Sequence, residues 1–412
     1  MNSPRRDALQ VIMDVLEDGA YANLRLKELH RDPSEGAFVN ALVYTALEHA
    51  RWSDYILSFY VKPQKRVIRN VLRLAMGELF FMDTPDHAAV NGAVALAKEC
   101  GKGASAGLVN GVLRRILRER DSLPPLPKDI VRRLSIRFGL PEWIVREWVE
   151  RFGEADTTRM LETPAPAMEI RAQHPYTGEA LEGALDVPFA RGQVDGNCFR
   201  LARSLPLSSP LFQEGKIAIQ GEGAMAICRF MGDMTGKRVL DACAAPGGKS
   251  AYLYSLTKGD IELVCYELHP HRVALMEQTF ERLHVKARCV EKDASLVSEG
   301  EDELFDAVLL DTPCSGLGLF REKPDVGLHR EEQDIRALCG TQAALLEACA
   351  RRIKPGGTLC YSTCTISKRE NEEQVEAFLQ EHPAFGLEEQ RQLLPHLHGT
   401  GGFYMARMKR CF

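Results

Sequence analysis

The sequence predicts a multidomain protein with an all-α domain, a small α+β connector and an α/β domain built on a doubly wound parallel sheet. Three observations support this fold class. Residues 1–122 show helical periodicity, a proline-rich segment follows at 122–127, and from about residue 236 short apolar runs alternate with helical segments. With 412 residues, the chain is long enough for about three domains.

The first domain, residues 1–122, is predicted to be helical. Apolar residues recur at helical spacing and define three buried faces. These faces contain Leu9, Ile12, Val15 and Leu16; Val67, Ile68, Val71, Leu72 and Ala75; and Val109, Val112, Leu113, Ile116 and Leu117.

The connector, residues 130–215, follows the stiff proline-rich segment. A helical stretch containing Trp143 and Trp148 precedes short strand-like pieces such as Met168–Arg171, with glycines at the turns. These mixed signals predict a small α+β, RRM-like subdomain.

The third domain, residues 216–412, is predicted to be α/β. Nearly continuous apolar runs at 238–241, 261–266 and 305–310 are typical of strands covered on both faces. Because helical segments separate them, we expect a parallel sheet that binds ligands at the carboxyl ends of its strands.

Composition excludes several classes of protein. The apolar fraction of 45% is typical of globular domains, and neither a signal peptide nor a membrane-length apolar run is found, so we expect a cytoplasmic protein without membrane contact. We also expect a monomer. The twelve cysteines include no C-x-x-C pair, so we expect neither a disulfide framework nor a metal site. The net charge of −5 means that any nucleic-acid binding must rest on local basic patches.

A glycine-rich turn follows the first predicted strand of the third domain, with the sequence Asp241-Ala242-Cys243-Ala244-Ala245-Pro246-Gly247-Gly248-Lys249. Its two glycines allow the backbone to approach a ligand at a helix start. Asp241, Glu267 and Asp293 end successive strands, and three such acids fit an adenosine ligand with a cationic sulfonium. Residues 243–250 match the P-loop pattern except at Cys243, where the pattern requires glycine, so a nucleotide triphosphatase is one alternative. A tight turn that binds no ligand is the other alternative, but such a turn leaves the three acids unexplained.

Two thiols are predicted at the carboxyl ends of neighbouring strands. Cys314 lies in Asp311-Thr312-Pro313-Cys314 and Cys364 in Tyr361-Ser362-Thr363-Cys364, and the fifty residues between them span one β-α-β unit. Most cysteines are buried apolar filler, but this placement favours function. Methylation of cytosine C5 requires a nucleophile at C6, and a thiolate is well suited to add there.

The chain resembles the RsmB/Sun-type 16S rRNA cytosine C5-methyltransferases. The resemblance rests on DACAAPGGKS (241–250), DTPCSGLG (311–318), YSTCTISKRENE (361–372) and GTGGFYMAR (399–407), while segments near residues 38–44, 87–91 and 109–115 resemble a NusB-like RNA-binding domain. It implies a Rossmann-like fold in the third domain, S-adenosyl-L-methionine as cofactor and 16S rRNA as partner. The chain departs from the usual pattern at Thr312 and Gly221.

The resemblance also implies the roles of individual residues. Cys364 is expected to attack C6, Cys314 to assist loss of the C5 proton, Asp311 to hydrogen-bond the base, and Lys249 to orient Asp311 or the base. The expected cofactor-binding residues are Asp241, Cys243, Ala244, Ala245, Pro246, Gly247, Gly248, Lys249, Glu267, Arg272, Asp293 and Asp311.

Basic residues suggest where RNA binds. Lys65, Arg69 and Arg73 recur every four residues, Arg114, Arg115 and Arg118 form a second cluster, and Arg321, Lys323 and Arg330 follow the Cys314 segment. The first two sets are either phosphate-binding patches or solvated helix faces, and the third is placed to hold phosphates that flank the target base. Two alternative functions stay open: the same chemistry on tRNA or another RNA, and a non-catalytic RNA-binding or antitermination module.

Overall fold

The computed structural model describes residues 3–29, 32–165, 168–296, 303–328 and 330–412. The chain folds into two compact units, and each is described by itself. Unit 1 contains residues 1–162 and 322–330, and unit 2 contains residues 163–321 and 331–412. None of the described helices is both long and apolar enough to cross a bilayer.

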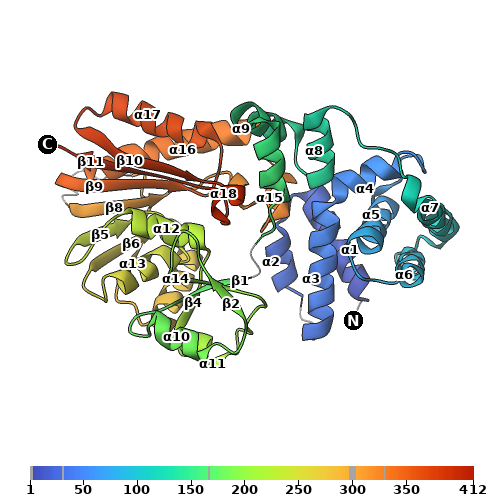
Figure 1. Ribbon diagram of the computed structural model, residues 1–412, viewed down its shortest axis with the longest axis horizontal. Coiled ribbons are helices and arrows are strands. Elements are labelled where there is room, and N and C mark those ends of the chain that lie inside the picture. The colour runs from blue at the N-terminus through green and yellow to red at the C-terminus, as the bar shows by residue number, and fades with distance from the viewer. Residues whose placement is uncertain (1–2, 30–31, 166–167, 297–302, 329) are drawn as a thin grey trace. The chain divides into compact units, whose positions relative to one another are not determined.

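Unit 1 is helical in its described residues (Figure 1). Its α-helices are α1 (Pro4–Asp18), α2 (Ala22–Lys27), α3 (Pro33–Glu48), α4 (Ala50–Leu57), α5 (Arg66–Phe81), α6 (Asp86–Glu99), α7 (Ala106–Arg118), α8 (Ile130–Phe138), α9 (Glu142–Glu162) and α15 (Pro324–Leu328).

The predicted apolar faces form the core of unit 1. Ile12 of α1, Val71 of α5 and Leu113 of α7 are fully buried in one cluster. Local signals set the ends of α1, because the Ser3 side chain accepts a hydrogen bond from the Arg6 amide and Gly19 ends the helix with a φ of 73°. The prediction of an all-α amino-terminal domain is therefore confirmed.

The two units differ from the boundaries drawn from the sequence. Helices α8 and α9 fall within the predicted connector but belong to unit 1, since α8 packs on α4 and α9 packs on α8. Helix α15 also belongs to unit 1, although it lies within the predicted third domain. Asp325 of α15 accepts a hydrogen bond from the Ala22 amide, a contact between residues about three hundred positions apart in the sequence.

Unit 2 begins with a small antiparallel sheet in the order β2-β3-β1-β4. Ile170, Phe199 and Ile217 form the centre of its core, and the predicted strand at 168–171 is confirmed. The elements are β1 (Met168–Ala172), α10 (Gly178–Ala184), β2 (Phe189–Arg191), β3 (Cys198–Leu201), α11 (Pro210–Gln213) and β4 (Ile217–Ile219).

The rest of unit 2 is built on a larger sheet, whose described strands have the order β10-β11-β9-β8-β5-β6-β7. Strands β5 to β9 pair in parallel, and β10 and β11 are antiparallel. The strands are β5 (Arg238–Asp241), β6 (Glu262–Glu267), β7 (Arg288–Glu291), β8 (Phe305–Asp311), β9 (Ile353–Thr363), β10 (Phe385–Leu393) and β11 (Phe403–Arg410). The α-helices are α12 (Glu222–Phe230), α13 (Gly248–Leu256), α14 (Pro270–Arg282), α16 (Glu332–Arg351), α17 (Glu372–Glu381) and α18 (Pro395–His398).

Helices cover both faces of the large sheet (Figure 1). Leu240 and Leu310 pack with α16 and α17, whereas Val239 and Leu309 pack with α12 and α13 on the opposite face. Successive strand residues are therefore all buried, which explains the nearly continuous apolar runs in the sequence. The predicted α/β fold with a doubly wound sheet is confirmed.

Candidate functional site

A cavity of about 820 Å³ lies at the carboxyl ends of the parallel strands of unit 2. Strand β5 pairs with β6 on one side and β8 on the other, so the chain changes direction across the sheet at this point. Open α/β sheets bind ligands in the crevice that this change leaves. The cavity therefore lies where the sequence predicted a binding site.

Eight of the predicted site residues line this cavity: Cys243, Ala245, Glu267, Arg272, Asp293, Asp311, Cys314 and Cys364. Six others lie outside its lining: Asp241, Ala244, Pro246, Gly247, Gly248 and Lys249. These six belong to the end of β5, the glycine-rich turn and the start of α13.

The glycine-rich turn has the conformation that its glycines predict. Gly247 has a φ of 95° and precedes α13, and a Cβ placed there would lie 2.7 Å from the Phe280 ring. Behind the turn, Asp241 is 1% exposed and its Oδ2 accepts a hydrogen bond from Ser250 Oγ at 2.5 Å. Burial raises the pKa of Asp241 to about 6, although Ser250 and Lys249 oppose this effect.

Two acidic side chains line the cavity beyond this turn. Glu267 ends β6, is 4% exposed and lies 3.4 Å from the Arg272 guanidinium. Asp293 lies two residues beyond β7, and its Oδ1 accepts hydrogen bonds from the amide and hydroxyl of Ser295 at 2.9 and 2.6 Å. The cavity thus carries carboxylate oxygens, which accept hydrogen bonds from hydroxyl and amino groups.

The sulfur atoms of Cys314 and Cys364 lie 3.2 Å apart at the cavity wall. Strands β8 and β9 are parallel neighbours, and Asp311 pairs with Ser362, so the residues that follow them must meet. The Cys364 amide also donates to Cys314 Sγ at 3.3 Å. A hydrogen bond with Cys364, burial and nearby negative charges raise the pKa of Cys314 well above its usual value.

Asp311 and Lys249 form an ion pair beside the thiols. Lys249 Nζ donates to Asp311 Oδ2 at 2.6 Å, and Ser362 Oγ donates to Oδ1 at 2.8 Å. Burial alone would lower the pKa of Lys249, but the Asp311 carboxylate outweighs it, so the pKa is raised. The ion pair therefore favours the charged form of Lys249 next to the Asp311 carboxylate.

Sequence reasoning missed one wall of the cavity. Helix α16 contributes Ala337, Gly340, Thr341 and Ala344, which are small residues three or four positions apart on one helix face. That spacing was readable in the sequence, but nothing local indicated that this face meets the strand ends. Leu268, His269, Lys292 and Ser295 were also missed, although they flank the acids that were singled out.

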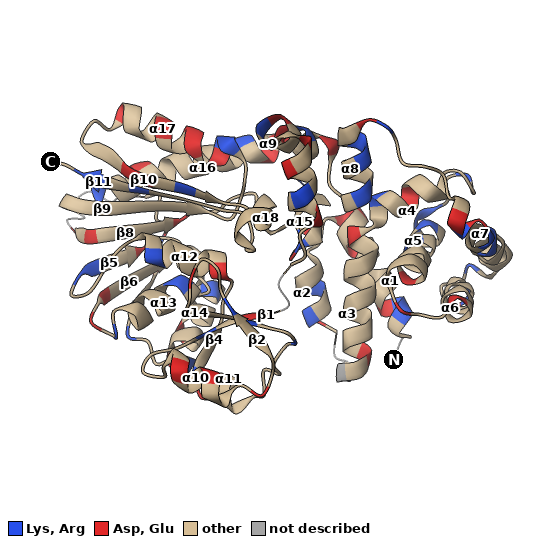
Figure 2. Ribbon diagram, in the orientation of Figure 1, with Lys and Arg blue, Asp and Glu red and all other residues tan. Residues whose placement is uncertain are grey.

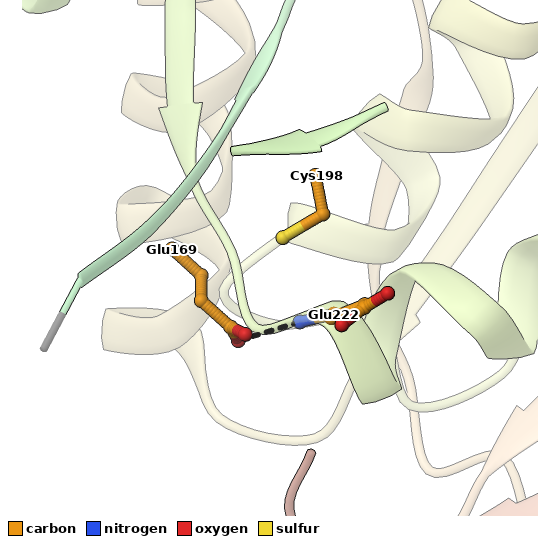
Figure 3. Close-up of side chains that lie close together, drawn as sticks. All are labelled: Glu169, Cys198 and Glu222. Atoms are coloured by element: carbon orange, nitrogen blue, oxygen red, sulfur yellow. Dashed lines mark hydrogen bonds between the residues drawn. The ribbon is translucent and has the colours of Figure 1, made fainter. Parts of the chain in front are cut away.

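A second cluster of potential metal ligands consists of Glu169 of β1, Cys198 of β3 and Glu222 of α12 (Figure 3). One carboxylate oxygen of each glutamate and the cysteine sulfur lie within 4.8 Å of one another. Arg200 forms ion pairs with both carboxylates and so supplies the positive charge of this cluster. Glu169 also accepts from the Glu222 amide at 2.8 Å and caps α12, where Gly221 has no side chain to do so. We therefore assign the cluster a structural role.

The basic stripe predicted on α5 is largely paired with acids. Arg69 bonds to Glu17 and Arg73 to Asp54, both at 2.5 Å, and Figure 2 shows acidic and basic segments interspersed on the helices of unit 1. Lys65 is exposed, and the described contacts include no ion pair to it. The stripe therefore offers RNA less positive charge than its spacing suggested.

The second basic cluster lies beside the segment that precedes α5. Arg115 of α7 lies over the Tyr60 ring at 5.1 Å. Tyr60, the exposed Phe59 and the exposed Lys62 line a cavity of about 550 Å³ in unit 1. An exposed aromatic ring next to unpaired lysines is a combination that suits single-stranded nucleic acid.

The third basic set is divided between the two units. Arg321 belongs to unit 2 and donates to the Thr163 carbonyl at 3.1 Å, whereas Lys323 and Arg330 belong to unit 1. The three residues therefore do not form one patch within either unit.

Comparisons with known proteins agree with this architecture. A family model described as 16S rRNA methyltransferase RsmB/F matches residues 231–409, and one described as the NusB family matches residues 2–118. A solved structure titled "Crystal Structure of PH0851" has a TM-score of 0.80 and 23% identity, with 98% of each chain covered. A methyltransferase homolog from Pyrococcus horikoshii has a TM-score of 0.60 and 26% identity, and covers 69% of this chain and 100% of its own.

The fold and the matched models define a methyltransferase domain joined to a helical NusB-type domain. The chain is also 34% identical to the probable ribosomal RNA small subunit methyltransferase B of Bacillus subtilis, with 99% of both proteins covered. It belongs to the RsmB/F family of 16S rRNA methyltransferases, and the resemblance inferred from the sequence motifs is confirmed.

Proposed function

We propose that this protein transfers a methyl group from S-adenosylmethionine to C5 of a cytosine in small-subunit rRNA, through a transient bond between Cys364 and C6. The family supports the broader reaction, rRNA methylation. The observation that carries the finer proposal is the pair of sulfur atoms 3.2 Å apart in the same cavity as Glu267, Asp293 and Asp311.

The residues of the cavity fit S-adenosylmethionine. Glu267 would accept hydrogen bonds from the ribose hydroxyls and Asp293 from the adenine amino group, and Cys243 and Ala245 of the glycine-rich turn border the same cavity. Asp311 also lines this cavity, and its carboxylate would favour a positively charged ligand. When bound, this cofactor supplies a methyl group activated by a positively charged sulfur.

The two cysteines divide the remaining chemistry. Cys364 Sγ bonds to C6 of the cytosine, and the electrons of the C5–C6 double bond become available at C5, which takes the methyl group. Asp311, held by Lys249 and Ser362, hydrogen-bonds the base near N3 and its amino group. Cys314 assists loss of the C5 proton, after which the double bond re-forms and the C6–S bond breaks.

RNA binding is expected to involve unit 1 as well as the cavity. We propose that Phe59, Tyr60, Lys62 and Lys65 contact single-stranded RNA, because they combine aromatic surface with lysines that form no described ion pair. The target cytosine must leave its stack to reach the ends of the strands, so unpaired RNA is the expected substrate.

Methyl transfer to unmodified rRNA tests the proposal. The purified protein should transfer radioactive methyl groups to small-subunit rRNA, and bisulfite mapping should locate them at C5 of one cytosine. Transfer to tRNA alone would support the same chemistry on another RNA. RNA binding without any transfer would favour a non-catalytic module.

A further inference from the structure

Glu370 is a fully buried acidic residue that joins the two cysteine segments. It ends a short 3-10 turn (Lys368–Glu370) just before α17. Its Oε1 accepts from the Ser315 amide at 2.8 Å, and its Oε2 accepts from Ser315 Oγ at 2.6 Å and from Thr365 Oγ1 at 3.4 Å. Ser315 follows Cys314 and Thr365 follows Cys364, so one carboxylate holds the neighbours of both thiols.

The described partners of the Glu370 carboxylate are hydrogen-bond donors of polar groups. Gln342 Nε2 donates to Glu370 Oε1 at 3.1 Å and to the Pro313 carbonyl at 3.0 Å. Among the described residues, no lysine, arginine or histidine forms an ion pair with Glu370. Burying a carboxylate without a counter-charge is costly unless hydrogen bonds compensate, and an apolar residue would fill the space at less cost. This arrangement points to a role beyond packing.

The segments that carry Cys314 and Cys364 lie beyond the paired parts of β8 and β9, so contacts other than sheet hydrogen bonds must hold them together. Regular pairing between β8 and β9 stops at Asp311 and Ser362, before either cysteine. Beyond that point the Gly318 amide donates to the Cys364 carbonyl, and the Cys364 amide donates to Cys314 Sγ. Ser315 Oγ and Thr365 Oγ1 also lie 2.8 Å apart, and Glu370 accepts hydrogen bonds from both hydroxyls, so its carboxylate adds a second link between the two segments.

We propose that Glu370 is a positioning residue for the cysteine pair, whose carboxylate fixes the separation and orientation of Cys314 and Cys364. This inference rests on the proposed cysteine chemistry. Glu370 sets the geometry in which Cys364 reaches the base and Cys314 reaches the C5 proton. Without it, the segments separate and product release suffers together with turnover.

The charge of Glu370 has a second consequence for Cys314. The hydrogen bond to Cys364, burial and the negative charges of Cys364, Glu370 and Asp311 together raise the pKa of Cys314 and favour its protonated form. The buried Tyr361 also interacts electrostatically with Cys314. The charge of Asp311 is partly balanced, because Asp311 forms an ion pair with Lys249. Glu370→Gln removes the charge but keeps the size of the side chain, so a shift of Cys314 alkylation to lower pH in this variant would report the loss of charge rather than the loss of burial.

The test compares Glu370→Gln and Glu370→Ala with a matched control, Glu169→Gln, in the full-length protein. Glu169 is also a buried acidic residue of unit 2, but it bonds to Arg200 and the Glu222 amide. Methyl transfer to unmodified small-subunit rRNA gives kcat and the KM for S-adenosylmethionine. Denaturing gels follow the protein–RNA adduct, and mass spectrometry follows iodoacetamide labelling of Cys314 at different pH values.

We expect kcat to fall about tenfold in Glu370→Gln and about a hundredfold in Glu370→Ala, with an unchanged KM for the cofactor and slower adduct release. Glu169→Gln should keep the wild-type kcat and the wild-type labelling profile. Folded Glu370 variants with wild-type kcat and labelling would overturn the inference. If they do not fold, Ser315→Ala and Gln342→Met decide. Ser315→Ala removes the bonds of Ser315 Oγ to Glu370 and to Thr365, whereas Gln342→Met removes a donor to Glu370 and leaves both hydroxyls in place. Slower release in both variants supports the role, and normal release in Gln342→Met rejects it. Absence of an adduct in the wild type would instead reject the proposed function and this inference with it.

Discussion

Asp241 illustrates, at the scale of one residue, how the site is built at the expense of stability. Its carboxyl group is buried behind the glycine-rich turn, and burial raises its pKa to about 6 from an ordinary value of 3.8. The folded state therefore binds a proton more tightly than the unfolded state. The resulting stabilisation is present below about pH 4, declines as the pH rises to about 6, and is absent above that pH.

Asp241→Asn should remove this pH dependence. Asparagine still accepts from Ser250 and carries no charge, so the variant should be more stable than the wild type at pH 7.5, by up to about 3 kcal/mol. Thermal unfolding of both proteins from about pH 4 to pH 8 measures the difference. A variant that is less stable at pH 7.5 would contradict this account.

The glycine-rich turn makes a prediction at the scale of an element. Gly247 combines a positive φ with close packing against Phe280 and Met276, so Gly247→Ala should destabilise unit 2 by about 1–3 kcal/mol and raise the KM for S-adenosylmethionine. Gly232→Ala is the matched control, because Gly232 has a φ of 84° but nothing within 4 Å of the added Cβ. Similar losses of stability in both variants would attribute the effect to backbone strain alone.

Strands and helices whose own residues carry a clear apolar pattern were predicted well from the sequence. The strands β5, β6 and β8 are buried on both faces, which produces apolar runs that need no knowledge of neighbours. The two thiols could be brought together because parallel neighbouring strands end at the same edge of a sheet. In these cases the local pattern already contains the tertiary information.

Features that depend on distant partners could not be predicted. The stripe of Lys65, Arg69 and Arg73 was read from spacing on one helix, but Glu17 and Asp54 come from other helices and neutralise two of its members. Helix α15 joins unit 1 from far along the chain, and α16 supplies a cavity wall through a face of small residues. Periodicity reports which face is buried, not what it is buried against.

At the scale of the whole molecule, RNA affinity and chemistry should be separable. Lys62→Glu with Lys65→Glu should weaken rRNA binding about tenfold near 100 mM salt and make the dependence on salt less steep, because two phosphate contacts are lost. The kcat at saturating RNA should not change. Lys102→Glu, an exposed lysine of unit 1 outside this segment, serves as the control. Unchanged affinity and salt dependence in the double variant would mean that these lysines are only solvated.

The cysteine pair allows the two sulfur atoms to be told apart by substitution. Cys364→Ala should abolish methyl transfer and covalent trapping of RNA, since no nucleophile would reach C6. Cys314→Ala should still form the bond to C6 and accumulate the protein–RNA adduct, because loss of the C5 proton is impaired. Denaturing gels with radiolabelled RNA distinguish the two results. Equal adduct formation by both variants would reject these roles.

The central claim is a bond between Cys364 and the pyrimidine ring, and mass spectrometry of a trapped complex tests it most directly. RNA with 5-fluorocytidine at the target position keeps the adduct intact, because the fluorine cannot leave as a proton does. After incubation with S-adenosylmethionine and proteolysis, the account predicts a methylated fluorocytidine attached to the peptide that contains Cys364. Attachment at Cys314, or rapid methylation of ordinary RNA with no adduct at either cysteine, would contradict it.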